Sequence, residues 1–336
     1  MWNLKFKPAE TRSTSTEGAE AAVQAYVDLA EGVYRLGRID EAADLMARAA
    51  EAAHELGDDD PRACRVVNRF AVIRARQGRH AEAERLLKRT VTVFDRAGLA
   101  GDSQLPTVLS NLGAVYRMAG KTEQARETFE RALRLAEVAD KESIEVAWTL
   151  DQIGDLNAGE DDIPAAVFAF QRALAIKEKV LGENDWDVAV TLNKLGELYL
   201  KQGRYNEAEA FLLRVLEIRE RVLGWGDPHL AKPLAKLGLL YRRQRKDGRA
   251  EHIVRYALKL FSSVLPPDHP DVIGCLKLLS EIYRGLTRYS DADAAWSLAQ
   301  NLSEGKGHSE KLAALTLPNP PRLSSAGLPA YQSAAR

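Results

Sequence analysis

The chain has 336 residues, of which 28% are charged and 46% hydrophobic, and its formal net charge is −1. No apolar run approaches the roughly 20 residues of a membrane-spanning helix, and the N-terminus lacks the apolar stretch of a secretory signal, so we expect a cytoplasmic protein. Two cysteines, Cys64 and Cys275, are too few and too far apart for a disulfide framework or a zinc finger. The near-zero net charge argues against a protein that binds nucleic acid in bulk.

Alanine dominates the composition, with 50 copies in the chain. Leu, Glu and Arg are also abundant, and all four residue types favour helices. The composition therefore predicts an all-α protein. In chain order, the first segment is a polar tail, residues 1–18, which is rich in Thr and Ser. We expect it to be disordered.

An internal repeat occupies the next segment, residues 19–302. A hydrophobic anchor recurs every 41 or 42 residues. The anchors are Leu29, Phe70, Leu112, Ile153, Leu195, Leu237 and Leu279. A small residue follows each anchor, alanine stands thirteen residues past every one, and a large apolar residue stands seventeen past. Agreement of seven copies at these columns predicts a repeat architecture.

Each repeat is expected to form two antiparallel helices. Small residues suit places where two helix backbones come close, and large residues fill the space between them. One repeat cannot bury its own apolar stripe, but stacked neighbours can. A glycine breaks the chain between the two helices in four repeats, at Gly37, Gly78, Gly120 and Gly203.

The fourth repeat is the least regular copy. Asn157 stands where an aromatic residue is expected, and Asp161 replaces the turn glycine, as Arg245 and Thr287 do in repeats six and seven. Pro164 would suit the first turn of the second helix. We interpret these departures as drift in a tolerant repeat, which fits them better than a hinge does.

These columns resemble the tetratricopeptide repeat family. The residues that carry the resemblance are Leu109, Leu112, Gly113, Tyr116, Ala125, Phe129 and Ala132. The longer period and the linkers LGENDWDVA, LGWGDPHLA and LPPDHPDVI look like the kinesin light chain subgroup. The resemblance implies a right-handed α-solenoid of seven antiparallel helix pairs. It also implies that the first helices line a concave face on which peptide ligands lie.

The C-terminal part of the chain follows the last repeat. Residues 303–317 contain a short apolar segment with Leu312 and Leu315, which we expect to form a small capping helix against the last repeat. Residues 318–336 are rich in Pro, Ser and Ala, and we expect them to be disordered. A cap this short leaves room for self-association through the C-terminal end.

No pattern in the chain points to catalysis. The six histidines form no metal-ligand pair, and the chain has no phosphate-binding loop and no nucleophile elbow. His229 and His269 fall in corresponding turns between repeats and are interpreted as turn residues. We expect no enzymatic activity, no metal and no cofactor, and we interpret both cysteines as buried thiols.

Charge is segregated along the array. Residues 139–187 carry a local excess of −8, whereas residues 229–260 carry an excess of +7. A basic face attracts and holds acidic segments. The resemblance to the kinesin light chain subgroup likewise implies short acidic peptides as ligands. We therefore predict a protein-interaction scaffold or adaptor that binds an acidic peptide segment of a partner in the concave groove.

The predicted groove residues are polar or basic side chains of the first helices of repeats five to seven. They are Asn193, Lys201, Lys232, Lys236, Arg242, Arg243, Lys277 and Arg284. Two alternatives stay open: a nucleic-acid-binding protein, which the acidic stretch disfavours because it repels phosphate, and a self-assembling repeat protein.

Overall fold

A computed structural model describes residues 15–35, 38–57, 60–96, 103–305 and 310–316. Every secondary-structure element in these ranges is a helix, and none is long and apolar enough to cross a membrane. The predicted C-terminal tail, residues 318–336, lies outside the described residues, as does most of the N-terminal tail. The first helix begins at Ser15, within the predicted tail of residues 1–18.

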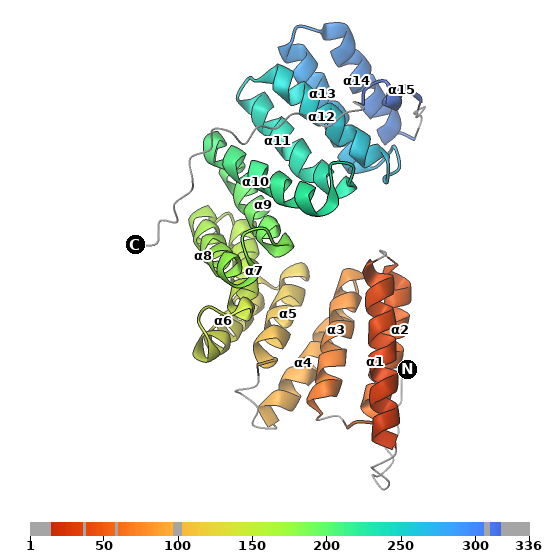
Figure 1. Ribbon diagram of the computed structural model, residues 1–336, viewed down its shortest axis with the longest axis vertical. Helices are drawn as coiled ribbons and strands as arrows, with labels where there is room; N and C mark the ends of the chain where they lie inside the picture. The colour runs from red at the N-terminus through yellow and green to blue at the C-terminus, as the bar shows by residue number, and fades with distance from the viewer. Residues whose placement is uncertain (1–14, 36–37, 58–59, 97–102, 306–309, 317–336) are drawn as a thin grey trace. The chain divides into compact units, whose positions relative to one another are not determined.

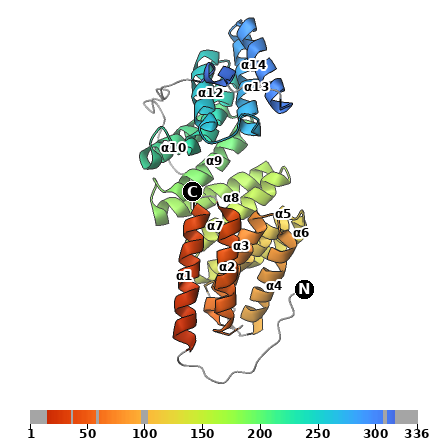
Figure 2. The ribbon, with the colours of Figure 1, turned by 90° about the vertical axis from the view of Figure 1, so that its right-hand side faces the viewer.

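The chain divides into two compact units, with the boundary between Asp162 and Ile163. The boundary therefore falls inside the fourth repeat, the copy that departs most from the pattern. Unit 1 holds α1 to α7, whose bounds are α1 Ser15–Arg35, α2 Ile39–His54, α3 Pro61–Arg76, α4 His80–Arg96, α5 Leu105–Met118, α6 Thr122–Ala139 and α7 Ile144–Gly159. In Figure 1 and Figure 2, α1 to α4 lie alongside one another as successive hairpins.

Unit 2 holds the remaining helices. Their bounds are α8 Ile163–Leu181, α9 Trp186–Lys201, α10 Tyr205–Leu223, the 3₁₀ turn η1 Pro228–Leu230, α11 Ala231–Arg243, α12 Asp247–Ser262, α13 Pro270–Gly285, α14 Tyr289–Ser303 and α15 Glu310–Ala313. The strongest packing pairs α9 with α10, α11 with α12, and α13 with α14, and each pair also packs on the next (Figure 1). The predicted all-α fold of paired antiparallel helices is confirmed.

The repeat columns occupy the core as expected. The seven alanines thirteen residues past the anchors are completely buried. The large residues seventeen past the anchors are also buried in six repeats, and the exception is Trp296 in the last repeat, which is 40% exposed. The first anchor, Leu29, is likewise exposed. Both exceptions lie in terminal repeats, where a neighbouring repeat is missing on one side.

The glycine after the anchor allows close contact between the two helices of the third and sixth repeats. A Cβ added at Gly113 would lie 2.6 Å from the ring of Phe129, and one added at Gly238 would lie 2.2 Å from Cγ2 of Val254. The glycines are therefore required by packing rather than by backbone conformation. This contact sets the distance between the first and second helices.

The turns between paired helices keep one backbone conformation in every described repeat. Gly78, Gly120 and Gly203 have positive φ angles between 72° and 76°. Asp161, Arg245 and Thr287 adopt φ angles of 64°, 59° and 60° at the same column. The turn geometry is therefore retained without glycine, at a cost in strain that is largest for the β-branched Thr287.

Capping side chains begin the first helices. Asp185 and Asp227 accept backbone N–H bonds at the starts of α9 and η1, at 2.7 and 2.8 Å. His269 does the same for α13, with its Nδ1 accepting from the N–H of Asp271 at 3.1 Å. The two inter-repeat histidines, His229 and His269, are thus turn and capping residues, as the sequence predicted.

The outer side of α14 closes the C-terminal end of unit 2. Most of its exposed residues are polar, and the exposed residues of α14 are Tyr289, Ser290, Asp293, Ala294, Trp296, Ser297, Gln300, Asn301 and Ser303. The predicted capping segment contains α15, and the contacts described for it are with α12 and the turn that follows α12, as set out below. Self-association through this end stays a prediction.

Candidate functional site

The eight predicted groove residues lie on three first helices of unit 2. Asn193 and Lys201 belong to α9, Lys277 and Arg284 belong to α13, and the other four belong to α11. These helices follow one another, with α11 packed between α9 and α13. We call the surface that these three helices form at the predicted residues the first-helix face.

A polar bridge joins α11 to α9 on this face. The Lys236 ammonium donates to Asn193 Oδ1 at 3.3 Å and pairs with Glu197 Oε2 at 2.7 Å. An equivalent bridge joins α5 to α3 in unit 1, where Asn111 donates to Asn68 at 2.9 Å. In both cases the donor stands 43 residues after the acceptor. The structure therefore brings Asn193 and Lys236 together as a link between repeats.

Two other cations of the set lie near carboxylates, Arg242 beside a buried one and Lys232 at the surface. Arg242 Nη1 lies 3.3 Å from Asp247 Oδ1, and Asp247 is almost completely buried where Gly285 leaves room for it. Lys232 lies 3.6 Å from Asp271 Oδ2. Because Arg242 pairs with a buried carboxylate of its own repeat, its charge is less available to a ligand than that of an exposed cation.

The remaining cations are more available. Lys201, Arg243 and Lys277 are exposed, and in the described part of the chain none of the three has a carboxylate partner. Lys277 lies over the ring of Trp296 at 5.9 Å from its centroid. Arg284 is exposed as well, and its only carboxylate among the described residues is Asp293, at 3.8 Å. An exposed pair of that length contributes little to stability.

Two aromatic side chains of the helices that form this face, Tyr241 and Trp186, contact neighbouring polar or charged residues. Tyr241 of α11 donates to Glu209 at 2.8 Å, and burial together with this hydrogen bond raises the pKa of its phenol. Arg219 lies under the inter-repeat turn, 4.7 Å from the Trp186 ring, and donates to the His229 carbonyl at 2.7 Å. Burial lowers the pKa of Arg219. These contacts hold the turns that begin α9 and α11.

The pairing of these lysines with carboxylates is what the sequence interpretation missed. Glu197 and Asp271 each stand 39 residues from the lysine that they meet. That spacing is a recognisable signal, because residues on successive first helices are brought together once per repeat. Among the described residues, no group of three His, Cys, Asp or Glu side chains could hold a metal ion.

Comparisons with known proteins identify the repeat. The tetratricopeptide repeat pattern matches residues 22–96, 104–179 and 187–263. The crystal structure of BtubC (BKLC) from P. vanneervenii is similar, with a TM-score of 0.58 and 20% identity over 73% of this chain and 96% of that one. Comparison with curated protein sequences finds no match.

Two further solved structures show the same fold. A putative kinesin light chain repeat structure from Podosopora anserina aligns with a TM-score of 0.51 and 17% identity, over 59% of this chain and 94% of that one. The apo form of the quorum sensor NprR from B. thuringiensis aligns with a TM-score of 0.64 and 16% identity, over 84% of this chain and 77% of that one. At these identities the likeness concerns the fold alone.

Proposed function

This chain belongs to the tetratricopeptide repeat family, whose members typically mediate protein–protein interactions, and we propose that it binds an acidic segment of a partner protein on the first-helix face of unit 2. The observation that carries the proposal is the set of exposed cations Lys201, Arg243 and Lys277, which lie on three successive first helices and meet no carboxylate among the described residues. Repeats five, six and seven each contribute one of these cations.

The spacing of these cations favours an extended ligand. Neighbouring helices pack about 8–10 Å apart, and an extended chain advances about 3.3 Å per residue. Carboxylates about three residues apart would therefore meet Lys201 and Arg243, which each stand six residues past their anchors. Lys277 stands two residues before its anchor, about 12 Å away along its helix, and would meet a more distant carboxylate of the same ligand. The bridge of Lys236, Asn193 and Glu197 joins α9 to α11 and supports their packing.

The arrangement favours an adaptor over a catalyst. The cations can attract and hold carboxylates, but no described nucleophile, base and orienting group come together on this face.

The test uses a fluorescent peptide with Glu at every third position and a matched peptide with Gln instead. The variant is Arg243→Glu with Lys277→Glu, because both side chains are exposed and reversal leaves no buried partner unpaired. We expect the acidic peptide to bind the native chain at low salt, the Gln peptide to bind at least tenfold more weakly, and the variant to lose the preference. Binding should weaken as salt rises.

The control is Arg221→Glu, which makes the same kind of charge change on α10, the second helix of repeat five. It should bind the acidic peptide as the native chain does. Equal binding by the native chain and the double variant would contradict the proposal. A single-stranded RNA that competes at the same residues would favour the nucleic-acid alternative instead.

A further inference from the structure

The chain returns to the middle of unit 2 after its last repeat. The Arg255 guanidinium of α12 donates to the carbonyl of Leu315 at 3.1 Å, and to those of Thr316 and Ala314 at 3.3 and 3.5 Å. Three successive carbonyls at the end of a short helix have no partner within the helix. Arg255 supplies that partner from a helix about 60 residues earlier.

The side chain of Arg255 is itself positioned by a carboxylate of the same helix. Its Nη1 lies 3.4 Å from Glu251 Oε1, one turn earlier on α12, and Glu251 also pairs with Arg288 at 2.9 Å. A guanidinium fixed by a carboxylate offers its remaining N–H groups in one direction. The three carbonyls of the C-terminal segment lie in that direction.

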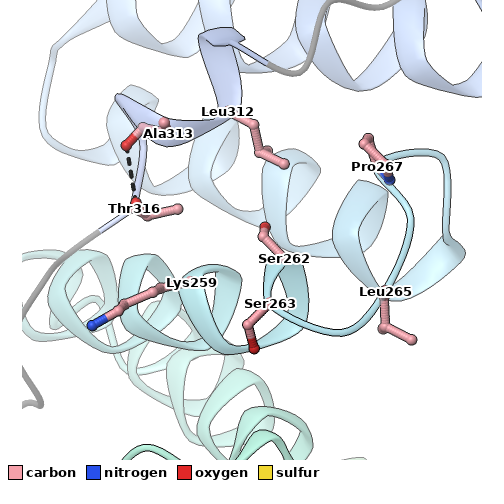
Figure 3. A pocket seen from close by; sticks show the side chains of 8 residues that line it. All are labelled: Lys259, Ser262, Ser263, Leu265, Pro267, Leu312, Ala313 and Thr316. Carbon is pink, nitrogen blue, oxygen red and sulfur yellow. Dashed lines mark hydrogen bonds between the residues drawn. The ribbon is translucent and has the colours of Figure 1, made fainter.

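An apolar contact accompanies the polar one. Leu312 is buried, and it points toward the end of α12 and the turn that follows it, as Figure 3 shows. The contact leaves space, because a pocket of about 320 Å³ remains between the segment and α12. Lys259, Ser262, Ser263, Leu265 and Pro267 line it opposite Leu312, Ala313 and Thr316.

The segment is a poor fit for the surface that it covers. One buried leucine and the bonds from one guanidinium must offset the ordering of the described residues 310–316. A free peptide of this kind would bind weakly. The segment docks because the chain holds it nearby, at an effective concentration in about the millimolar range.

We propose that this surface of α12 is a second protein-binding site, which the chain covers with its own residues 310–316. The matching partner is a short helical segment that presents its last carbonyls to Arg255 and a side chain larger than leucine to the pocket. Such a partner displaces residues 310–316, because it fills the space that Leu312 leaves. This site is separate from the first-helix face and does not depend on the function proposed for it.

The experiment uses the full chain and two labelled peptides. One has the sequence of residues 310–316, and the other carries Trp in the place of Leu312. The native chain should bind the first peptide barely and the Trp peptide at least tenfold more tightly. A chain with Leu312→Asp, whose own segment is released, should bind both peptides at least tenfold more tightly than the native chain does.

Variants of α12 distinguish the clamp from a general effect. In the Leu312→Asp chain, Arg255→Lys should weaken both peptides about tenfold, because an ammonium cannot bond three carbonyls as a guanidinium does. Arg249→Lys on the same helix is the matched control and should leave binding unchanged. Circular dichroism confirms that each variant is folded.

Two outcomes would overturn the proposal. Equal binding of the peptides by the native and Leu312→Asp chains would mean that residues 310–316 do not compete for the surface. Equal binding by the Arg255→Lys and Arg249→Lys chains would mean that Arg255 is not the group that holds the carbonyls. Failure of the acidic peptide at the first-helix face would affect neither result.

Discussion

A single turn position distinguishes the repeats at the residue scale. Gly203 adopts a left-handed backbone at no steric cost, whereas Thr287 carries a branched Cβ in the same conformation. The only hydrogen bond described for its hydroxyl is donation to the adjacent Leu286 carbonyl at 2.7 Å. The turn therefore keeps its shape because packing on both sides demands it, and not because Thr favours it.

Replacing Thr287 by glycine should stabilise the protein. A left-handed backbone costs about 1–2 kcal/mol of strain for an L-residue, and glycine removes this cost. The greater conformational freedom of glycine in the unfolded chain offsets roughly 0.4–1 kcal/mol of that gain. We expect the free energy of unfolding to rise by about 0.5–1 kcal/mol, as measured by urea denaturation. Ala294→Gly, on the exposed side of α14, should lower it by about 1 kcal/mol. A loss of stability in Thr287→Gly would show that the side chain is needed.

The reactivity of the two cysteines depends on the burial of each thiol. Both are buried, and burial raises the pKa of the Cys275 thiol to about 12, with Asp271 adding to the shift. Because the thiolate is the reactive form, Cys275 should not react with iodoacetamide at pH 8 in the folded protein and should react readily in urea. Mass spectrometry of the labelled peptides measures this. Rapid labelling of the native chain at Cys275 would contradict the burial.

Pairs of helices are the unit that the sequence specifies at the scale of the element. The column of small residues and the column of large residues meet within one repeat, as Gly238 and Val254 do. A change at either one alters the distance between two helices.

Gly238→Ala should therefore destabilise unit 2. The added Cβ would lie 2.2 Å from Val254 Cγ2, and overpacking of a core typically costs about 1–3 kcal/mol. Adding Val254→Ala to the same chain should recover part of that loss by making room. Thermal unfolding followed by circular dichroism measures both effects.

The matched control is Gly274→Ala on α13, where an added Cβ meets nothing within 4 Å. Alanine favours a helix by about 1 kcal/mol over glycine, so this variant should unfold at a higher temperature. Similar effects of the two substitutions would mean that contact between α11 and α12 does not limit residue size at Gly238.

A second column links successive repeats. A basic residue just before the second helix pairs with a glutamate of the preceding repeat: Lys121 with Glu84 at 2.7 Å, and Arg288 with Glu251 at 2.9 Å. Hydrogen bonds from Lys121 and Lys88 hold the pKa of Glu84 below its usual value. Each cation also lies over a tyrosine of its own repeat.

The fourth repeat reverses this pairing. Arg126 stands in the glutamate column of the third repeat and pairs with Glu160, while Asp162 stands in the basic column. The third and fourth repeats have thus both changed the sign of the charge at these two columns. Sequence comparison by single columns presents this change as drift, because the compensation appears only when two columns are compared.

Charge segregation belongs to the whole molecule. The net charge of −1 is the sum of an acidic stretch, residues 139–187, and a basic stretch, residues 229–260. The basic stretch covers both α11, which contributes to the first-helix face, and α12, where Arg255 holds the C-terminal segment. Both proposed sites therefore include residues of this one basic stretch.

This separation predicts how an acidic peptide would associate with the chain. If exposed cations attract it, the association rate constant should fall as salt rises, while the dissociation rate constant changes little. Stopped-flow fluorescence measures both. Arg243→Glu should lower the association rate constant at low salt and converge with the native chain at high salt. A difference confined to dissociation would point to contacts other than long-range attraction.

The sequence by itself determined the repeats, the paired helices and the close contacts between them. Those features depend on small and large residues at regular spacing, such as Ala208 and Leu212, and a regular spacing is visible in one chain. The sequence also placed the predicted site residues on three successive first helices.

Only the tertiary structure decided which charges are available and where residues 310–316 lie. Lys236 meets Glu197 and Arg242 meets Asp247, whereas Lys201 and Arg243 stay exposed without a carboxylate partner in the described part of the chain. Residues 310–316 of the predicted capping segment lie on α12, because Arg255 donates hydrogen bonds to their last carbonyls. Such contacts join residues that are brought together by helix packing, and their free energies depend on distances and burial that no periodicity records.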